Sequence, residues 1–354
     1  MLPEMPPASI KRPRALRPRI SGGLLTACAL FMLTCVLMFD AGCAAVSNTA
    51  GQVSTQRRER RVNNQTPDGA NSTGTDQTKM PETKTEKKES TTKTAPTLFY
   101  NELKKALRAR KLKLETVCDL DNPVSRRVLE DYGAMFLATS NVSPPPVCVF
   151  ASEAEVSQFQ EEADFTTAVI GGDRIELQPA AMSALLAARE EARALKLDIT
   201  PRGGEEAARR SYTDTVRLWN TRFLPALNYW NKKGRLSKEQ VARLRRLPLG
   251  EQVREVLELE KSGIFFSKDF SKSILYSIAA PGTSQHLAML ALDVEQFANE
   301  RVRRILARHG WFQTVLSDLP HFTYLGLEEK DLTARGLRPV ISGKQLFWIP
   351  NVGD

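Results

Sequence analysis

Hydrophobic residues recur at helical spacing in several stretches of the chain, and shorter apolar runs lie between them. The helices that this spacing predicts cover residues 98–107, 124–137, 179–195, 205–219, 238–260 and 294–309. The strands that the apolar runs predict cover residues 147–150, 167–170, 174–178, 197–200, 274–278, 322–325 and 345–349. Helices and strands alternate without the regular rhythm of a parallel α/β sheet. We therefore expect an α+β fold in which helices flank a small antiparallel sheet.

Residues 44–95 interrupt this pattern, because they are mainly Thr, Ser, Gln, Asn, Lys and Glu. Between residues 50 and 95 the only large apolar side chains are Val53, Val62 and Met80. Such a segment buries too little surface to offset its chain entropy, so we expect a disordered tether. After the tether we separate residues 96–175, whose role the sequence does not identify, from a domain over residues 176–354.

The first 43 residues have the order of an export signal. Five basic residues precede an apolar run over residues 24–39, and this run is shorter than the ~20 residues that span a bilayer. Ala41-Gly42-Cys43 resembles a bacterial lipoprotein cleavage site with Cys43 as the lipidated residue, although Asp40 stands where an aliphatic residue is usual. A cleaved secreted form and an uncleaved membrane anchor are the alternatives. All three place the protein in the cell envelope, either tethered to the membrane or periplasmic.

Charge and cysteine content agree with an exported protein that does not bind nucleic acid. The net charge is +9, but residues 1–95 carry 14 Lys and Arg against 8 Asp and Glu, so the globular part is nearly balanced. Basic and aromatic residues are not interleaved as in nucleic-acid interfaces. Cys118 and Cys148 lie in the globular part and could pair in an oxidising compartment. Two buried free thiols are the alternative.

A candidate metal site stands out because the chain contains only three histidines. His286 and Asp293 lie in one short segment, and His321 follows Asp318 by three residues in another. Two imidazoles and a carboxylate form a zinc ligand set that leaves one position open for water, as catalytic zinc requires. Asp318 is of the right type to take a proton from that water.

Two motifs around these residues resemble a known family. The sequence AAPGTSQH over residues 279–286, followed by ALD over 291–293, is similar to the A-x-P-G-x-S-x-H…A-x-D signature of zinc D-alanyl-D-alanine carboxypeptidases of the vancomycin-resistance type. The sequence DLPHF over 318–322 resembles the D-x-P-H-F box of the related L-alanyl-D-glutamate endopeptidases. The carboxypeptidase branch more often has E-x-W-H there. The resemblance is good over residues 274–326, weaker over about 180–230 and not visible over 96–175.

The resemblance implies a zinc D,D-peptidase (hedgehog-like) fold and a role for each residue. His286, Asp293 and His321 would bind zinc, and Asp318 would act as the general base. The family also carries an arginine that binds the substrate carboxylate or polarises its carbonyl. Arg210 matches the R-S-Y part of that motif, whereas Arg202 matches its distance from the preceding strand. Either guanidinium could bind a carboxylate in a bidentate manner, and a solvated helix face is the alternative.

Other residues near the motifs have simpler explanations. Ser284 could hydrogen-bond the substrate backbone or merely stabilise a turn. Met289 replaces a glycine that is usual in the family, and Thr323 replaces a frequent arginine. His309 precedes Gly310 at a predicted helix end, where the helix dipole accounts for it. We expect the four tryptophans to pack in the core.

The leading hypothesis is an exported zinc peptidase that acts on peptidoglycan stem peptides. The PGTS sequence favours a D-alanyl-D-alanine carboxypeptidase, and the DLPHF box favours an endopeptidase. A non-catalytic wall-binding relative of the fold is the second hypothesis. A purely structural zinc site fits poorly, because such sites are usually closed by a fourth protein ligand and rich in cysteine.

Overall fold

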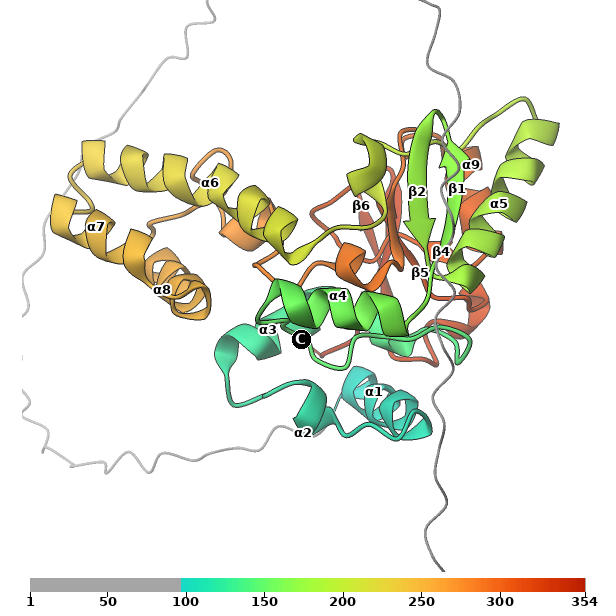
Figure 1. Ribbon diagram of the computed structural model, residues 1–354, viewed down its shortest axis with the longest axis horizontal. Coiled ribbons are helices and arrows are strands. Elements are labelled where there is room, and N and C mark those ends of the chain that lie inside the picture. Colours follow the sequence, from blue (N-terminus) through green and yellow to red (C-terminus); the bar gives the residue numbers. More distant parts are fainter. Residues whose placement is uncertain (1–96, 354) are drawn as a thin grey trace, which may run out of the picture. The chain divides into compact units, whose positions relative to one another are not determined.

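The computed structural model describes residues 97–353, and Figure 1 shows their arrangement. The α-helices are α1 (Leu98–Ala109), α2 (Leu114–Val117), α3 (Pro123–Tyr132), α4 (Glu153–Glu162), α5 (Pro179–Ala194), α6 (Tyr212–Lys232), α7 (Lys238–Arg246), α8 (Leu249–Lys261) and α9 (Glu300–Arg308). The 3-10 helices are η1 (Gly133–Leu137), η2 (Gly204–Ala207), η3 (Ile274–Tyr276), η4 (Gln285–Ala288) and η5 (Glu329–Asp331). The expected signal, Cys43 and the expected tether lie outside the described residues.

Small antiparallel sheets flanked by helices confirm the α+β class, but there are three such sheets in the described part rather than one. The strands are β1 (Thr166–Ile170), β2 (Asp173–Leu177), β3 (Ala291–Asp293), β4 (Trp311–Phe312), β5 (His321–Tyr324), β6 (Leu337–Ser342) and β7 (Gln345–Pro350). The sheets are β1-β2, β3-β5-β4 and β6-β7. In the central sheet Asp293 pairs with His321, which brings two of the candidate ligands to the same register position.

Several predicted boundaries were wrong because capping residues and prolines decide where a helix begins. The helix expected from 205 begins at Tyr212, where Ser211 and Asp214 form a capping box. The helix expected from 294 begins at Glu300, after Asn299 accepts two backbone N–H bonds. Pro248 cannot donate a backbone hydrogen bond, and the single helix expected over 238–260 is divided there into α7 and α8.

The predicted strands include further errors. Residues 147–150 and 197–200 form no strand, and residues 274–278 contain the 3-10 helix η3. The helix expected over 124–137 changes to 3-10 geometry at Gly133. Short strands such as β3 and β4 carry too few residues to show an alternation, so the sequence pattern did not predict them.

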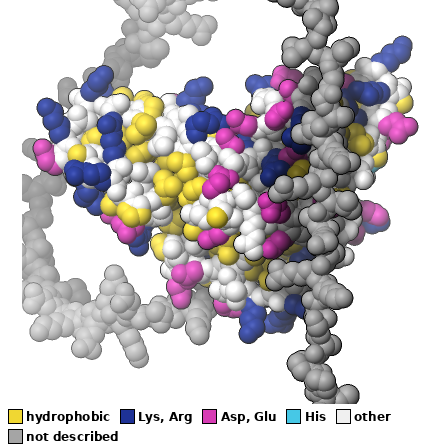
Figure 2. Space-filling model, viewed as in Figure 1, with side chains coloured by type: hydrophobic (Ala, Val, Ile, Leu, Met, Phe, Trp, Pro, Cys, Tyr) yellow, Lys and Arg dark blue, Asp and Glu magenta, His cyan; other side chains and the backbone are white. Residues whose placement is uncertain are grey.

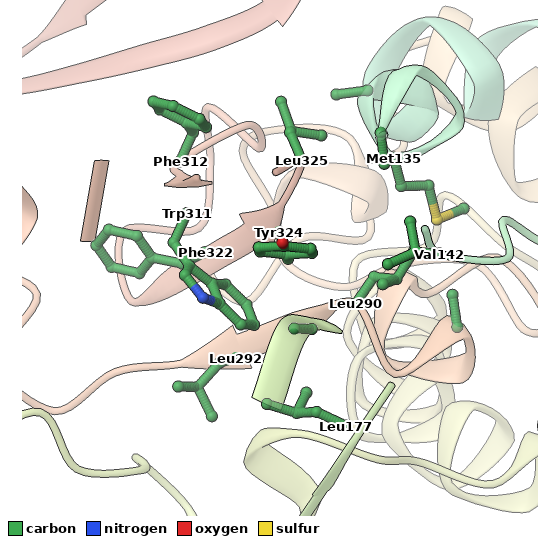
Figure 3. Packing of buried hydrophobic residues seen from close by; sticks show 14 of the residues in the cluster. Met135, Val142, Leu177, Leu290, Leu292, Trp311, Phe312, Phe322, Tyr324 and Leu325 are labelled. Carbon is green, nitrogen blue, oxygen red and sulfur yellow. The ribbon is translucent and has the colours of Figure 1, made fainter. Parts of the chain in front are cut away.

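The main hydrophobic core draws on both parts of the predicted domain division. Phe99 and Phe136 lie in the same buried cluster as Leu292, Trp311 and Trp348. Figure 3 shows Trp311, Phe322 and Tyr324 beside Leu290 and Leu292 in this cluster. The boundary expected between residues 175 and 176 falls inside β2 and separates no second core. Residues 97–175 therefore belong to the structure that supports the candidate site.

A second cluster forms the core of what we call the helical arm, residues 212–278, which contains α6, α7 and α8 (Figure 1). Trp219 is fully buried in it and donates its indole N–H to Gln252 Oε1 at 2.8 Å, which ties α6 to α8. Trp230 packs against the same cluster. All four tryptophans thus pack in or against a core, as expected. Figure 2 shows Lys and Arg side chains on the visible face of the arm.

Cys118 and Cys148 form a disulfide that joins residues 30 positions apart. The backbone N–H of Cys148 also donates to Val117 O at 2.8 Å, so this bond tightens an existing contact. A crosslink of this length stabilises a fold by roughly 3–4 kcal/mol, mainly by restricting the unfolded chain. We expect the Cys118→Ser/Cys148→Ser variant to lose about that free energy of unfolding in guanidinium titrations. A loss below ~1 kcal/mol would contradict a structural role for the bond.

Candidate metal centre

The first half of the site is a tight turn that the sequence PGTS makes possible. Gly282 has φ +77°, and a Cβ on it would collide with the carbonyl oxygen of Phe150. The Phe150 N–H donates to Gly282 O at 2.9 Å, so residues 97–175 brace the turn directly. Ser284 then caps η4, its hydroxyl accepting the His286 N–H at 3.4 Å. The glycine and the serine together fix the backbone that places His286 in the lining of a cleft.

The chain reverses again between His286 and Asp293. Met289 ends η4 with φ +54°, a left-handed conformation that favours glycine. The family that the motifs resemble usually has glycine at this position, and the left-handed conformation explains that preference. Met289 is fully buried, so its side chain contributes burial where a glycine would contribute none. The turn leads into β3, which ends at Asp293 opposite His321 of β5.

The structure brings His286, Asp293 and His321 together as three buried groups that could hold a metal ion. His286 Nε2 lies 3.1 Å from His321 Nδ1 and 3.4 Å from Asp293 Oδ1. His321 Nδ1 lies 3.3 Å from the same Asp293 oxygen. Ligands held ~2.0–2.1 Å from a tetrahedral centre are about 3.3 Å apart. The three donors therefore already have the spacing of one face of a tetrahedral metal site.

Hydrogen bonds on the far sides of the imidazoles aim their lone pairs at this point. His286 Nδ1 lies 3.1 Å from Ala208 O, and a carbonyl oxygen can only accept, so Nδ1 carries the proton. His321 Nε2 lies 2.8 Å from Gln285 Oε1, which fixes its proton on Nε2. His286 Nε2 and His321 Nδ1 are then both unprotonated and face the Asp293 carboxylate. Three buried acceptors directed at one point could hold a cation between them.

Gln285 determines the orientation of His321, and sequence reasoning missed it. Its Nε2 donates to Tyr132 O at 2.7 Å, so its Oε1 must face His321. Thr323 donates to the same Oε1 at 2.5 Å and is hydrogen-bonded to Thr314 at 2.6 Å. Thr323 lies two residues after His321 on β5 and so shares its face of the strand. That spacing was the available signal, and Thr323 therefore supports the ligand His321 through Gln285.

Burial and neighbouring charge keep His286 and Asp293 in the protonation states that suit metal binding. Burial, with help from the Arg210 charge, lowers the pKa of His286 to about 4 against the opposing effect of Asp293. Burial also raises the pKa of Asp293, but the imidazoles of His286 and His321 outweigh it and hold that pKa well below its ordinary value. Near neutral pH the site therefore offers a neutral His286 imidazole and an ionised Asp293 carboxylate.

The two candidate arginines have different positions. Arg210 lies at the cleft and donates from Nη2 to Asp293 Oδ2 at 2.7 Å, while its Nε donates to Glu206 O at 2.9 Å. Asp293 can thus offer Oδ1 to a metal while Oδ2 is held. The Arg202 side chain is paired with Glu295 at 3.1 Å and does not line the cleft. The structure therefore brings Arg210, but not the Arg202 side chain, to the candidate site.

Because Arg210 holds the carboxylate of the candidate ligand Asp293, we expect its replacement to weaken metal binding at this site. We expect Arg210→Lys to lower zinc affinity about 10–100-fold, the range typical of groups that hold metal ligands. Lysine keeps the charge but loses the two-point geometry that binds both Asp293 and Glu206 O. Arg202→Lys is the matched control and should change the affinity less than about twofold. Competition with a chromophoric chelator measures both, and equal effects of the two variants would contradict this role.

A cleft of about 270 Å³ opens beside the ligands and is lined by Ser284, His286, Asp318 and His321, among others. Asp318 is exposed to solvent in this cleft, although many protein atoms lie around its carboxylate. Desolvation by these atoms raises the pKa of Asp318; the His321 charge opposes the rise, Asp293 adds to it, and Arg210 opposes it. No side-chain hydrogen bond or ion pair within residues 97–353 engages its carboxylate. Its turn is fixed to the strand because His321 N–H donates to Asp318 O at 3.3 Å.

The third histidine lies apart from this site. His309 ends α9, and its Nε2 lies 2.9 Å from Glu191 Oε2 on α5. It thus links two helices, in keeping with the structural explanation given from the sequence.

Comparison with protein-family models and with curated proteins finds no match for the chain. Among residues 97–353, no helix combines the length and the apolar character of a membrane span.

Proposed function

We propose that the protein is an exported zinc metallopeptidase with a zinc D,D-peptidase-like fold that cleaves peptidoglycan stem peptides, most simply as a D-alanyl-D-alanine carboxypeptidase. The observation that carries the proposal is the triangle of His286, Asp293 and His321, whose donor spacings are 3.1–3.4 Å. A nitrogen, nitrogen and oxygen set of this size suits zinc, and it leaves a coordination position for catalysis. The PGTS and DLPHF motifs on the same residues supply the link to stem peptides.

The chain's own residues suit peptide hydrolysis. When bound to the triangle, zinc would supply Lewis-acid polarisation of the scissile carbonyl and lower the pKa of water. Asp318 lies in the same cleft with its carboxylate free, and it accepts the proton of the attacking water. Asp318 then returns that proton to the leaving amine. Arg210 holds Asp293, and Gln285 holds His321, so the ligands stay in place while the substrate is bound.

Export is part of the proposal and draws on two features. The basic and apolar segment at the start of the sequence has the pattern of a secretory signal, and Cys43 stands at a lipoprotein-type position. The disulfide between Cys118 and Cys148 is typical of proteins that fold in an oxidising compartment. Both features support a location where peptidoglycan is the available substrate.

Incubation of the purified, zinc-loaded protein with a stem pentapeptide tests the proposal. Mass spectrometry should show chelator-sensitive loss of one alanine. Chelator-sensitive cleavage between L-Ala and D-Glu would instead favour the endopeptidase, which the DLPHF box supports. The absence of zinc-dependent cleavage of either bond would overturn the peptidase proposal and favour a non-catalytic wall-binding protein.

A further inference from the structure

The helical arm contributes part of the lining of the cleft that contains the candidate ligands, and this part carries two cationic side chains. Arg222 of α6 and Lys268 of the loop after α8 both line the cleft that contains Asp318. Neither forms an ion pair with a carboxylate within the described residues. Arg222 donates only from Nη1 to Thr221 Oγ1, at 2.9 Å, and its buried Nε has no hydrogen-bond partner. Two cations that line one cleft without a carboxylate partner are suited to an anionic ligand.

The two other charged side chains of the lining either bind another residue of the protein or act in the proposed hydrolysis. Arg210, the third cation of the lining, is bound to Asp293 and to Glu206 O. Asp318 is the only acidic side chain of the lining, and the proposed mechanism uses it as the base. The cations of the arm are therefore the groups that remain to bind a negative charge on the substrate.

Hydrogen bonds fix the backbone segments of the arm that carry these two residues. The Lys268 N–H donates to Ser277 Oγ at 3.1 Å, and Ser267 closes the same loop by accepting from Lys272 N–H at 2.9 Å. At the start of α6, Thr215 Oγ1 accepts the Gly282 N–H at 3.1 Å, which joins the arm to the turn before His286. These bonds fix the backbone around Lys268 and join α6 to the turn, so only the two side chains need to be ordered when an anion binds.

We propose that Arg222 and Lys268 form a subsite for the free C-terminal carboxylate of a short peptide, which makes the protein an exopeptidase. This inference rests on the proposed function, and it selects the carboxypeptidase over the endopeptidase. The cleft volume of about 270 Å³ supports it, since it is slightly below the ~300–1,000 Å³ usual for small-molecule sites. A cleft of that size suits the end of a peptide better than a long internal stretch.

Calorimetric titration of the zinc-loaded Asp318→Asn protein separates binding from hydrolysis. The probes are an N-acetylated tripeptide that ends in D-Ala-D-Ala and the same tripeptide with a C-terminal amide. We expect the free acid to bind at least about tenfold more tightly than the amide, as charge-assisted hydrogen bonds allow. Arg222→Gln and, independently, Lys268→Gln should each remove most of that preference. Equal binding of acid and amide by the parent protein would overturn the subsite.

Arg243→Gln is the matched control, because Arg243 lies on the arm, pairs with Glu255 at 2.7 Å and does not line the cleft. It should keep the full preference for the free acid. If Arg222→Gln and Lys268→Gln lose no more of that preference than Arg243→Gln, the assignment is wrong. A preserved preference in a protein that hydrolyses no peptide would support the subsite and refute the peptidase proposal, so the two can fail separately.

Discussion

The Asp318→Asn protein is expected to bind zinc as tightly as the parent and to lose about 10²–10⁴-fold in kcat on a stem pentapeptide, the usual contribution of a general base. Asparagine has nearly the shape of aspartate but cannot accept the proton of water. Asp318 lies in the cleft, while His286, Asp293 and His321 form the metal triangle without it. The expected result is therefore a loss of turnover without a loss of metal.

The two measurements must be made on the same protein sample. Zinc content by elemental analysis should stay at one ion per chain, and steady-state kinetics should show the loss mainly in kcat. Asp331→Asn is a matched control, since Asp331 lies in η5, is exposed and does not line the cleft. Retention of more than about a tenth of the parent kcat by Asp318→Asn would mean that another group takes the proton.

His321→Ala is expected to abolish stoichiometric zinc binding, with a loss of affinity larger than the ~10–100-fold that removal of a supporting group causes. It removes one of only three donors in the triangle and also leaves Gln285 Oε1 without its imidazole partner. Gln285→Ala should produce a smaller loss, within the 10–100-fold range, because the His321 ring remains but its orientation is less fixed.

The chain supplies its own control for this experiment. His309 is the one histidine outside the triangle, and it pairs with Glu191 between two helices. His309→Ala should bind one zinc with the affinity of the parent protein. Competition against a chromophoric chelator gives all three affinities. If His321→Ala binds zinc with the parent affinity, the zinc site does not include His321 and the proposed triangle is wrong.

The ligands of the candidate site could be predicted from residue patterns, but their supporting contacts could not. The ligands could be predicted because rare histidines stood in short motifs with a suitably spaced aspartate. The supporting contacts could not be predicted in the same way. Ala208 acts through its backbone carbonyl, which any residue offers, and Gln285 acts through an orientation that Tyr132 imposes from 153 residues away. Neither contribution leaves a pattern in the local sequence.

The same contrast separates Arg210 from Arg202. Both are the right residue type near the right segment, and the sequence left both open. The choice depends on the fold between them, where η2 and the capping box at Ser211 set the path of the chain toward His286. Backbone contact at 3.4 Å between Arg210 N and His286 O then brings Arg210, rather than Arg202, to Asp293.

The sequence by itself determined the α+β class, the β1-β2 hairpin, helix α5 and the candidate ligands, because each depends on local spacing or on residue chemistry. Only the tertiary structure decided that residues 97–175 share the main core, that Cys118 pairs with Cys148, and that Arg222 and Lys268 face the cleft. These facts depend on contacts between segments far apart in the chain. Which of these contacts form depends on the apolar surface that two distant segments bury together, so the sequence of one segment alone does not determine them.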